Sequence, residues 1–269
     1  MKYNDLKKEL IKLYNYYNNP NINEIDYCLS EICKTNILEV KFLDFSIFEV
    51  YKIKKIVKQH LKTKIPYQKI FKKAYFFGLE FYVNNFVLTP RFDSEILVET
   101  ALKEKFNSCL DLCCGSGCLG LSIKNNRKET DLTLADISKK ALKVSKINAK
   151  KLNLQANFVQ TDMFNNINGR YDLIICNPPY IETNVVKNLD DEVKNFDPII
   201  SLDGGEDGLK FYKIIFDNLD KFLNENGVCL LEIGYNQGNL INLFKQKYKD
   251  VTLIKDYNNL DRVIKIKKE

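Results

Sequence analysis

The stretch Asp172-Leu-Ile-Ile-Cys-Asn-Pro-Pro-Tyr180 carries the strongest structural signal in this chain. Its apolar run, Leu173 to Cys176, has the length and composition of a strand buried in a parallel sheet. Pro178 and Pro179 end the strand, because a proline has no N–H to donate and restricts the residue before it to extended backbone. The motif therefore predicts a rigid ledge at the carboxyl end of a strand, where open α/β sheets bind their ligands.

Around this ledge, short apolar runs alternate with segments of helical periodicity. The strands are predicted at residues 108–113, 132–136, 156–161, 172–177, 227–233, 251–257 and 262–267. The helices are predicted at residues 118–125, 138–152, 207–224 and 237–248. This alternation predicts an α/β fold with a mainly parallel, seven-stranded sheet and helices on both of its faces.

The N-terminal part of the chain has a different pattern. Apolar residues recur there at helical spacing, and Pro66 is placed to close a small helical domain. Phe76 to Val83, then Asn84-Asn85, then Phe86 to Leu88 predict a β-hairpin with its turn at the two asparagines. We therefore expect a helical domain at residues 1–73, a hairpin linker at 74–90 and a main domain at 91–269.

The composition is that of a globular protein, with 45% hydrophobic and 28% charged residues in a chain of 269. No apolar run approaches the roughly 20 residues of a membrane span. The N-terminus also lacks the apolar core of a signal peptide. We therefore expect a cytoplasmic protein without membrane contact.

The chain contains eight cysteines and a single histidine, His60. Cys114 and Cys118 have the spacing of two metal ligands, but no second pair matches them, so we expect buried, reduced thiols and no metal site. One histidine argues against a Ser-His-Asp or Cys-His catalyst. His60 lies in a lysine-rich helical stretch, which predicts a surface position.

The ledge offers hydrogen-bond acceptors beside a flat aromatic ring. Asn177 supplies an amide oxygen, the backbone beside Pro178 and Pro179 can supply carbonyls without partners, and Tyr180 supplies the ring. These groups predict a receptor for a planar –NH2 group, whose nitrogen is a poor nucleophile because its lone pair is delocalised. Holding both hydrogens would aim that lone pair at an electrophile, so catalysis would come from positioning and electrostatics. A proline-rich turn that merely closes a strand is the alternative.

A glycine-rich loop follows the first predicted strand of the main domain. It consists of Cys113, Cys114, Gly115, Ser116 and Gly117. Glycine allows a tight turn and close approach of a ligand to the backbone. Such a loop alone also occurs in dinucleotide enzymes.

Three carboxylates follow three successive predicted strands: Asp111, Asp136 and Asp162. Asp136 is placed to accept hydrogen bonds from ribose hydroxyls, and Asp162 with its neighbour Met163 is placed to clamp a purine. The chain has no P-loop lysine motif, so the carboxylates suit a cationic, phosphate-free nucleoside. S-adenosylmethionine fits that description, with its sulfonium as the electrophile. The alternative is that the three carboxylates only cap strand ends and form turns.

With these residues, the chain resembles the class I S-adenosylmethionine methyltransferases, which have a Rossmann-like fold, and more narrowly the HemK/PrmC family of release-factor glutamine N5-methyltransferases. The resemblance is carried by Leu88-Thr-Pro-Arg-Phe-Asp-Ser-Glu-Ile-Leu-Val-Glu99, the glycine loop, Asn177-Pro-Pro-Tyr-Ile181, Phe196-Asp-Pro198, Leu202-Asp-Gly-Gly-Glu-Asp-Gly-Leu209 and Leu231-Glu-Ile-Gly-Tyr-Asn-Gln-Gly238. It implies a substrate-recognition role for residues 1–73 and a catalytic domain at 91–269. The chain departs from the family at Cys113, where glycine is usual, at Met163, where bacterial relatives often have tryptophan, and at Phe92, where proline is common.

The resemblance also implies roles for the site residues. Cys113–Gly117 and Asp136 would hold S-adenosylmethionine, Met163 would flank the adenine, and Asn177 would touch both ligands. The motif Asn177–Tyr180 would grip the side-chain amide of the glutamine in the Gly-Gly-Gln motif of class 1 peptide chain release factors. The products would be N5-methylglutamine and S-adenosylhomocysteine, and we expect a monomeric enzyme.

The closest alternative is an adenine-N6 or other exocyclic-amine methyltransferase acting on RNA or DNA, because the same ledge can hold a base amine. Residues 181–208 hold eight Asp and Glu against two Lys, a net charge of −6, which opposes a phosphate backbone. Lys52 to Lys73 contains nine lysines and no acid, and it is the one feature that favours RNA or a ribosome-bound target; a basic helical face is more often simply solvated. We therefore do not expect direct nucleic-acid binding. A binding module that has lost catalysis is a third reading, against which the intact motif argues.

Overall fold

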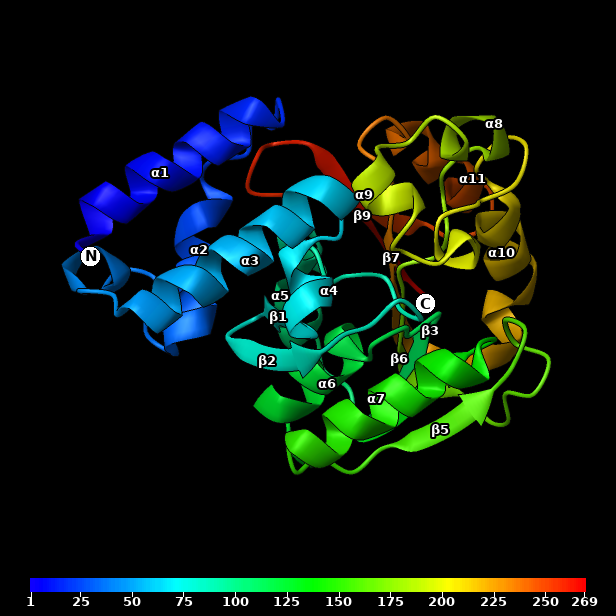
Figure 1. Ribbon diagram of the computed structural model, residues 1–269. Helices are drawn as coiled ribbons and strands as arrows, with labels where there is room; N and C mark the ends of the chain where they lie inside the picture. Colours follow the sequence, from blue (N-terminus) through cyan, green and yellow to red (C-terminus); the bar gives the residue numbers. More distant parts are fainter. The chain divides into compact units, whose positions relative to one another are not determined.

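The computed structural model describes residues 1–269. The chain divides into two compact units, Met1–Lys72 and Lys73–Glu269, whose elements are labelled in Figure 1. No helix is both long enough and apolar enough to cross a membrane.

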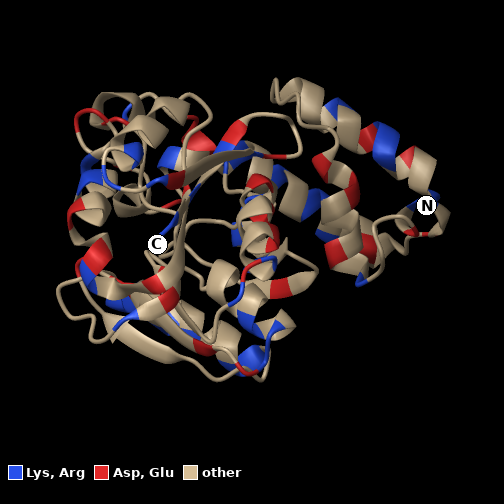
Figure 2. Cartoon of the chain, turned by 180° about the vertical axis from the view of Figure 1, so that it is seen from behind, with Lys and Arg blue, Asp and Glu red and all other residues tan.

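The first unit is built from helices. They are α1 (Tyr3–Tyr16), α2 (Glu24–Cys33), the 3-10 turn η1 (Val40–Phe42), α3 (Ile47–Thr63) and α4 (Tyr67–Phe71). A capping box begins α3: the Ser46 hydroxyl accepts from the Glu49 N–H at 3.2 Å, and the Glu49 carboxylate accepts from the Ser46 N–H at 2.8 Å. These helices carry both acidic and basic residues (Figure 2).

His60 lies inside this unit, so the predicted surface position is wrong. Its side chain is fully buried, stacks on Tyr67 with ring centroids 4.3 Å apart, and places Nδ1 2.9 Å from the Ile65 carbonyl oxygen. The prediction was based on the lysines that surround His60 in the sequence. On α3, His60 shares the helical face of Ile53 and Val57, and that face packs into the core.

The hairpin begins earlier than predicted and turns at a different place. Strands β1 (Lys73–Phe76) and β2 (Leu79–Tyr82) pair antiparallel, and the turn between them is Phe77-Gly78, with φ of 48° and 72°. Two positive φ values are typical of a type I′ hairpin turn. The predicted turn at Asn84-Asn85 is therefore wrong, because a phenylalanine occupies the left-handed position where asparagine is the usual signal.

The second unit contains a seven-stranded sheet with the order β5-β4-β3-β6-β7-β9-β8. Its strands are β3 (Ser108–Leu112), β4 (Asp131–Asp136), β5 (Asn157–Gln160), β6 (Tyr171–Cys176), β7 (Leu223–Glu232), β8 (Asp250–Lys255) and β9 (Asp261–Lys267). Neighbours from β5 to β7 are parallel, and β9 runs antiparallel to both β7 and β8. The predicted α/β fold and its mainly parallel sheet are confirmed.

Helices cover both faces of this sheet (Figure 1). On one face, α5 (Glu95–Leu102), α6 (Cys118–Asn126) and α7 (Lys139–Lys151) pack over a core that contains Leu97, Leu121 and Leu142. On the other face, α10 (Lys210–Phe222) and α11 (Ile241–Lys245) pack over a core that contains Tyr212 and Phe244. The helix predicted at 237–248 is shorter, because the turn η4 (Gly238–Leu240) precedes α11.

The strand order places a crevice at the end of two central strands. From β3 the chain proceeds through β4 to the β5 edge, and it then returns to β6 on the other side of β3. In a sheet of this kind, a crevice forms outside the carboxyl ends of the strands at the point where the strand order reverses. Cys113 follows β3 and Asn177 follows β6, so the glycine loop and the ledge meet at this point.

Candidate active site

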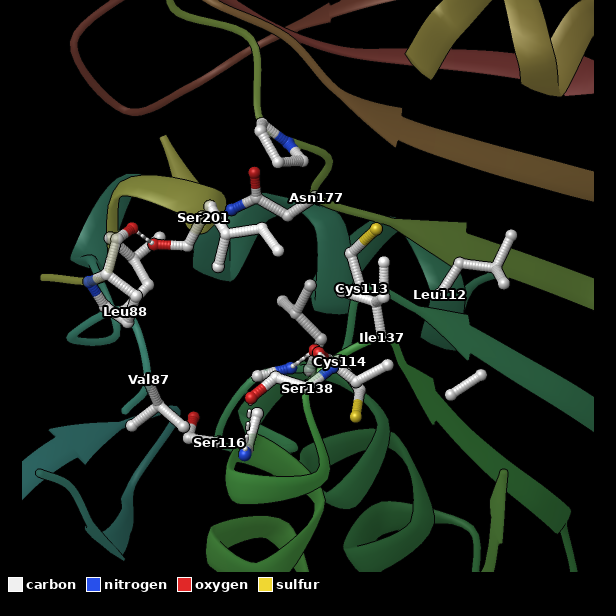
Figure 3. A pocket seen from close by; sticks show the side chains of 18 of the residues that line it. Val87, Leu88, Leu112, Cys113, Cys114, Ser116, Ile137, Ser138, Asn177 and Ser201 are labelled. Carbon is white, nitrogen blue, oxygen red and sulfur yellow. Dashed lines mark hydrogen bonds between the residues drawn. The ribbon is translucent and has the colours of Figure 1, made fainter. Parts of the chain in front are cut away.

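A cavity of about 210 Å³ lies at this edge of the sheet. The loops after β3, β4, β5 and β6 all contribute to its wall. Nine of the residues predicted from the sequence line it: Cys113, Cys114, Gly115, Ser116, Asp136, Asp162, Met163, Asn177 and Pro179. In Figure 3, Asn177 and Ser201 lie on one side of the cavity, and Ser116 and Ser138 lie on the opposite side. Gly117, Pro178 and Tyr180 do not line it.

The glycine loop turns sharply because several of its residues adopt left-handed backbone. Cys113, Gly115 and Gly117 have φ of 57°, 53° and 78°. A Cβ at Gly117 would lie 3.1 Å from both the Leu121 Cδ1 and the Ser145 Cβ, so glycine permits close packing there. A Cβ at Gly115 would meet nothing within 4 Å, so that part of the loop borders open space.

Asp136 ties the β4 loop to the glycine loop. Its Oδ2 accepts from the Gly115 N–H at 2.9 Å, and its Oδ1 accepts from the Ser138 N–H at 2.8 Å. Burial raises the pKa of Asp136, and the two backbone hydrogen bonds oppose that rise. A carboxylate oxygen has room for a second hydrogen bond, so the capping role does not exclude contact with a ligand.

Asp111 lies beneath the loop instead of facing the cavity. It is fully buried, and its Oδ2 accepts from the Gly120 N–H at 2.9 Å, whereas its Oδ1 has no hydrogen-bond partner. Burial raises the pKa of Asp111 to about 8. The expectation that three strand-end carboxylates surround a ligand is therefore wrong for Asp111, because its alternating position on β3 turns it toward α6.

Some polar groups of the ledge are hydrogen-bonded within the protein, and others have no partner there. The Tyr180 carbonyl accepts from Gln237 Nε2 at 3.1 Å, and the Ile181 carbonyl accepts from the Gly204 N–H at 2.7 Å. The Asn177 side chain and the carbonyls of Pro178 and Pro179 have no hydrogen-bond partner in the protein. Of these residues, Asn177 and Pro179 line the cavity and are placed to accept hydrogens from a ligand.

The Tyr180 ring packs against the core beneath α10. Burial raises the pKa of its hydroxyl to about 12. The prediction that this ring forms an aromatic surface beneath a bound amide stays a prediction, because Tyr180 is not part of the cavity wall.

The chain matches the family model "Methyltransferase small domain" over residues 91–201. It is 33% identical to the release factor glutamine methyltransferase of Thermodesulfovibrio yellowstonii, over 100% of this chain and 99% of the relative. The enzymes of the same name from Clostridium acetobutylicum and Mycoplasma mycoides are each 38% identical, covering 76% and 81% of this chain and 75% and 82% of the relatives. This chain belongs to the release factor glutamine methyltransferase family.

Two solved structures share the fold of this release factor glutamine methyltransferase family member. The hMettl16 catalytic domain in complex with a 3′UTR hairpin has a TM-score of 0.54 at 15% identity, covering 83% of each chain. A 16S rRNA methyltransferase of Thermus thermophilus, in complex with AdoMet and guanosine, has a TM-score of 0.51 at 17% identity, covering 73% of this chain and 50% of the other. At such identities the likeness extends to the fold alone.

At two departures from the family pattern, a sulfur-containing side chain occupies a strained backbone position. Cys113 and Met163 both have positive φ, 57° and 49°, and the Cys113 Sγ lies 3.8 Å from the Met163 Sδ. Non-glycine residues in left-handed backbone cost roughly 1 kcal/mol or more, and such positions cluster at ligand sites. Both residues line the cavity.

Part of the cavity wall comes from outside the strand ends and was not predicted from the sequence. Residues 86–91 and Pro198, Ile200 and Ser201 also line the cavity. The Thr89 N–H and hydroxyl donate to Asp197 Oδ1 at 3.1 and 3.2 Å and join the two segments. Leu88–Arg91 and Pro198 belong to stretches that carry the family resemblance, but the chemistry of these residues did not predict a position in the cavity wall.

Proposed function

We propose that this protein transfers a methyl group from S-adenosylmethionine to the side-chain amide nitrogen (N5) of the glutamine in the Gly-Gly-Gln motif of class 1 peptide chain release factors. The observation that carries the proposal is that the glycine loop after β3 and the free Asn177 amide after β6 line one cavity. A methyl donor and an amide acceptor must meet at such a place. Because release factors act in translation, the reaction belongs in the cytoplasm.

The cavity has the features that S-adenosylmethionine requires. Cys113–Ser116 would lie against the ligand through their backbone, and Asp136 would accept from ribose hydroxyls. Asp162 is exposed beside the cavity and adds negative charge, which suits a cationic ligand. Met163 and the Cys113 sulfur would contact the adenine. When bound, S-adenosylmethionine supplies an electrophilic methyl group on a positively charged sulfur.

The ledge would hold the acceptor amide. The Asn177 side-chain oxygen and one free prolyl carbonyl would each accept one hydrogen of the glutamine –NH2 group. This arrangement fixes the plane of the amide and polarises its nitrogen without requiring a strong base. Asn177 lines the cavity, so it is placed to contact both reactants.

The N-terminal unit would supply substrate recognition. Five large apolar side chains lie exposed within one segment of it, with exposed fractions between 67% and 92%: Leu38, Phe42, Ile47, Phe48 and Tyr51. We call these five residues the apolar patch. Large exposed apolar surfaces on a folded unit are typical of protein interaction sites. Lysines at 41, 52 and 55 border the patch in the sequence and favour an acidic partner surface.

A direct assay tests the proposal. The purified protein would be incubated with isotopically labelled S-adenosylmethionine and either a class 1 release factor, its Gly-Gly-Asn variant, or a mixture of tRNA and rRNA. We expect label in the release factor alone, with one methyl group located on the glutamine by peptide mass spectrometry. Labelling of the RNA, with the release factor left unmodified, would replace the proposal with the nucleic-acid alternative.

A further inference from the structure

We infer that Gln237 is a positioning residue for methyl transfer: it holds the Tyr180 peptide so that the ledge presents its prolyl carbonyls, and not that of Tyr180, to the substrate. The inference rests on the proposed function, because it concerns how the same ledge grips the acceptor amide. Gln237 lies in the turn after β7, far from the ledge in sequence.

Both the nitrogen and the oxygen of the Gln237 side-chain amide form hydrogen bonds. Its Nε2 donates to the Tyr180 carbonyl at 3.1 Å, and its Oε1 accepts from the Gly234 N–H at 2.9 Å. A backbone N–H can only donate and a carbonyl can only accept, so one orientation of the amide satisfies both bonds. A further bond, from the Gln237 N–H to the Gly234 carbonyl at 2.8 Å, fixes the backbone of the turn.

The acidic, glycine-rich segment, Leu202–Leu209, also packs against the Tyr180 peptide. A Cβ at Gly208 would lie 2.5 Å from the Tyr180 carbonyl oxygen and 3.0 Å from Gln237 Nε2. A Cβ at Gly204 would lie 2.8 Å from both the Pro179 carbonyl oxygen and the Tyr180 Cα. The Tyr180 peptide is therefore enclosed by two glycines and one amide side chain, with no room for a side chain at either glycine.

These contacts decide which acceptors of the ledge remain available. Gln237 engages the Tyr180 carbonyl and Gly204 engages the Ile181 carbonyl. The carbonyls of Pro178 and Pro179 stay free. Without the Gln237 bond, the Tyr180 carbonyl would lose its hydrogen-bond donor, and the Tyr180 peptide could rotate and shift the prolyl carbonyl that precedes it. A shifted ledge would hold the substrate amide at a displaced position, and displacements of about 1 Å can cost about 100-fold in rate.

Gln237→Glu is the sharpest test, because it keeps the shape of the side chain and replaces the donor with an oxygen that repels the carbonyl. We expect kcat for release-factor methylation to fall roughly 10- to 100-fold, with the dissociation constant for S-adenosylmethionine unchanged. Gln237→Leu should lower kcat as well, but less. Gln246→Glu, at an exposed position after α11, makes the same charge change elsewhere and should leave kcat unchanged.

Crystal structures of the wild-type protein and Gln237→Glu complete the test. We expect the Tyr180 peptide to be rotated in the variant, with Asn177 unmoved. An unchanged ledge, an unchanged kcat, or a loss of cofactor binding that matches the loss of turnover would each overturn the inference. A wild-type protein that does not methylate release factors would instead overturn the proposed function, and the two crystal structures would still decide the role of Gln237.

Discussion

At the residue scale, some side chains of the site are hydrogen-bonded within the protein, and others have no partner there. Asp136 uses both oxygens on backbone N–H groups, and Asp111 is enclosed beneath the loop. The Asn177 amide lines the cavity without a partner in the protein. A polar group is stable in a cavity wall only while water or a ligand bonds to it, so Asn177 is available for substrate.

Asn177→Ala tests the acceptor contact. Removing one preorganised polar contact to the reacting group lowers turnover by about 100-fold in comparable cases, and we expect a loss of that size in kcat. The measurement is methylation of a release factor under saturating substrates, with Asn184→Ala, an exposed position beyond the ledge, as the control. Near-normal turnover by Asn177→Ala would remove the proposed mechanism.

Asp136→Ala tests the cofactor half of the cavity. The variant loses the acceptor for ribose hydroxyls and the tie to the Gly115 N–H, so we expect S-adenosylmethionine to bind about 10-fold or more weakly. Isothermal titration calorimetry measures this directly. If the dissociation constant is the same as that of the wild type, the ribose lies elsewhere.

Asp111→Asn tests the buried acid beneath the loop. Burial raises the Asp111 pKa from 3.8 to about 8, so between these values the folded protein keeps a proton that the unfolded chain has released. The free energy of unfolding is therefore expected to fall as the pH rises from about 4 to about 8. An amide cannot lose that proton, so the variant should gain stability relative to the wild type across this range. Urea unfolding at about pH 5 and about pH 8 measures the difference; equal pH slopes would contradict a buried, protonated acid.

At the element scale, the site depends on a contact between a helix, a hairpin and a loop. Asn148 is buried on α7, accepts from the Tyr82 N–H at 2.7 Å, and donates to the carbonyls of Tyr82 and Ser116 at 3.0 and 2.9 Å. One side chain thus joins the end of β2 to the glycine loop. The hairpin is consequently part of the second unit, whose boundary lies at Lys72 and Lys73.

Asn148→Ala should loosen this junction. It leaves three backbone groups without partners, and each buried unsatisfied group costs about 1–3 kcal/mol, so we expect the free energy of unfolding to fall by at least about 2 kcal/mol. Binding of S-adenosylmethionine should weaken too, because the Ser116 loop is no longer held. Chemical unfolding and calorimetry measure the two effects, with the exposed Asn242→Ala as control. A destabilised variant with unchanged cofactor affinity would show that the loop keeps its shape alone.

At the scale of the whole molecule, the chain separates a helical unit from a sheet-based unit that contains the cavity. The helical unit has its own core, and it exposes the apolar patch at its surface. Large apolar side chains left in water have a cost that binding to a partner removes. A protein substrate has enough surface to cover such a patch, whereas a small molecule does not.

The double variant Phe48→Ala, Tyr51→Ala tests whether the apolar patch binds the protein substrate. Both side chains are exposed, so the free energy of unfolding should stay unchanged. We expect kcat/KM for the intact release factor to fall by about 10-fold or more, since buried aromatic anchors often carry over 1 kcal/mol of binding. The affinity for S-adenosylmethionine should not change. Tyr16→Ala, on an exposed part of α1, is the control. Equal kcat/KM values would assign the patch another role.

Features that depend on local backbone chemistry could be predicted from the amino-acid sequence. Apolar runs, proline and glycine located all seven strands of the sheet and the ledge at the end of β6. Strand β7 begins at Leu223 instead of residue 227, beyond an irregularity in its pairing with β6. The residues named for the cavity were also largely recovered, because the carboxyl ends of parallel strands meet at one edge.

Features that depend on contacts between distant residues became visible in the folded protein and were not predicted. The burial of His60, the enclosure of Asp111 beneath its loop and the bond between Gln237 and the Tyr180 carbonyl all depend on the environment of the side chain. Periodicity indicates which face of an element is apolar, but it does not report which neighbour covers a polar group. The free energy of a polar side chain depends on that neighbour, so its role became defined only when the elements packed together.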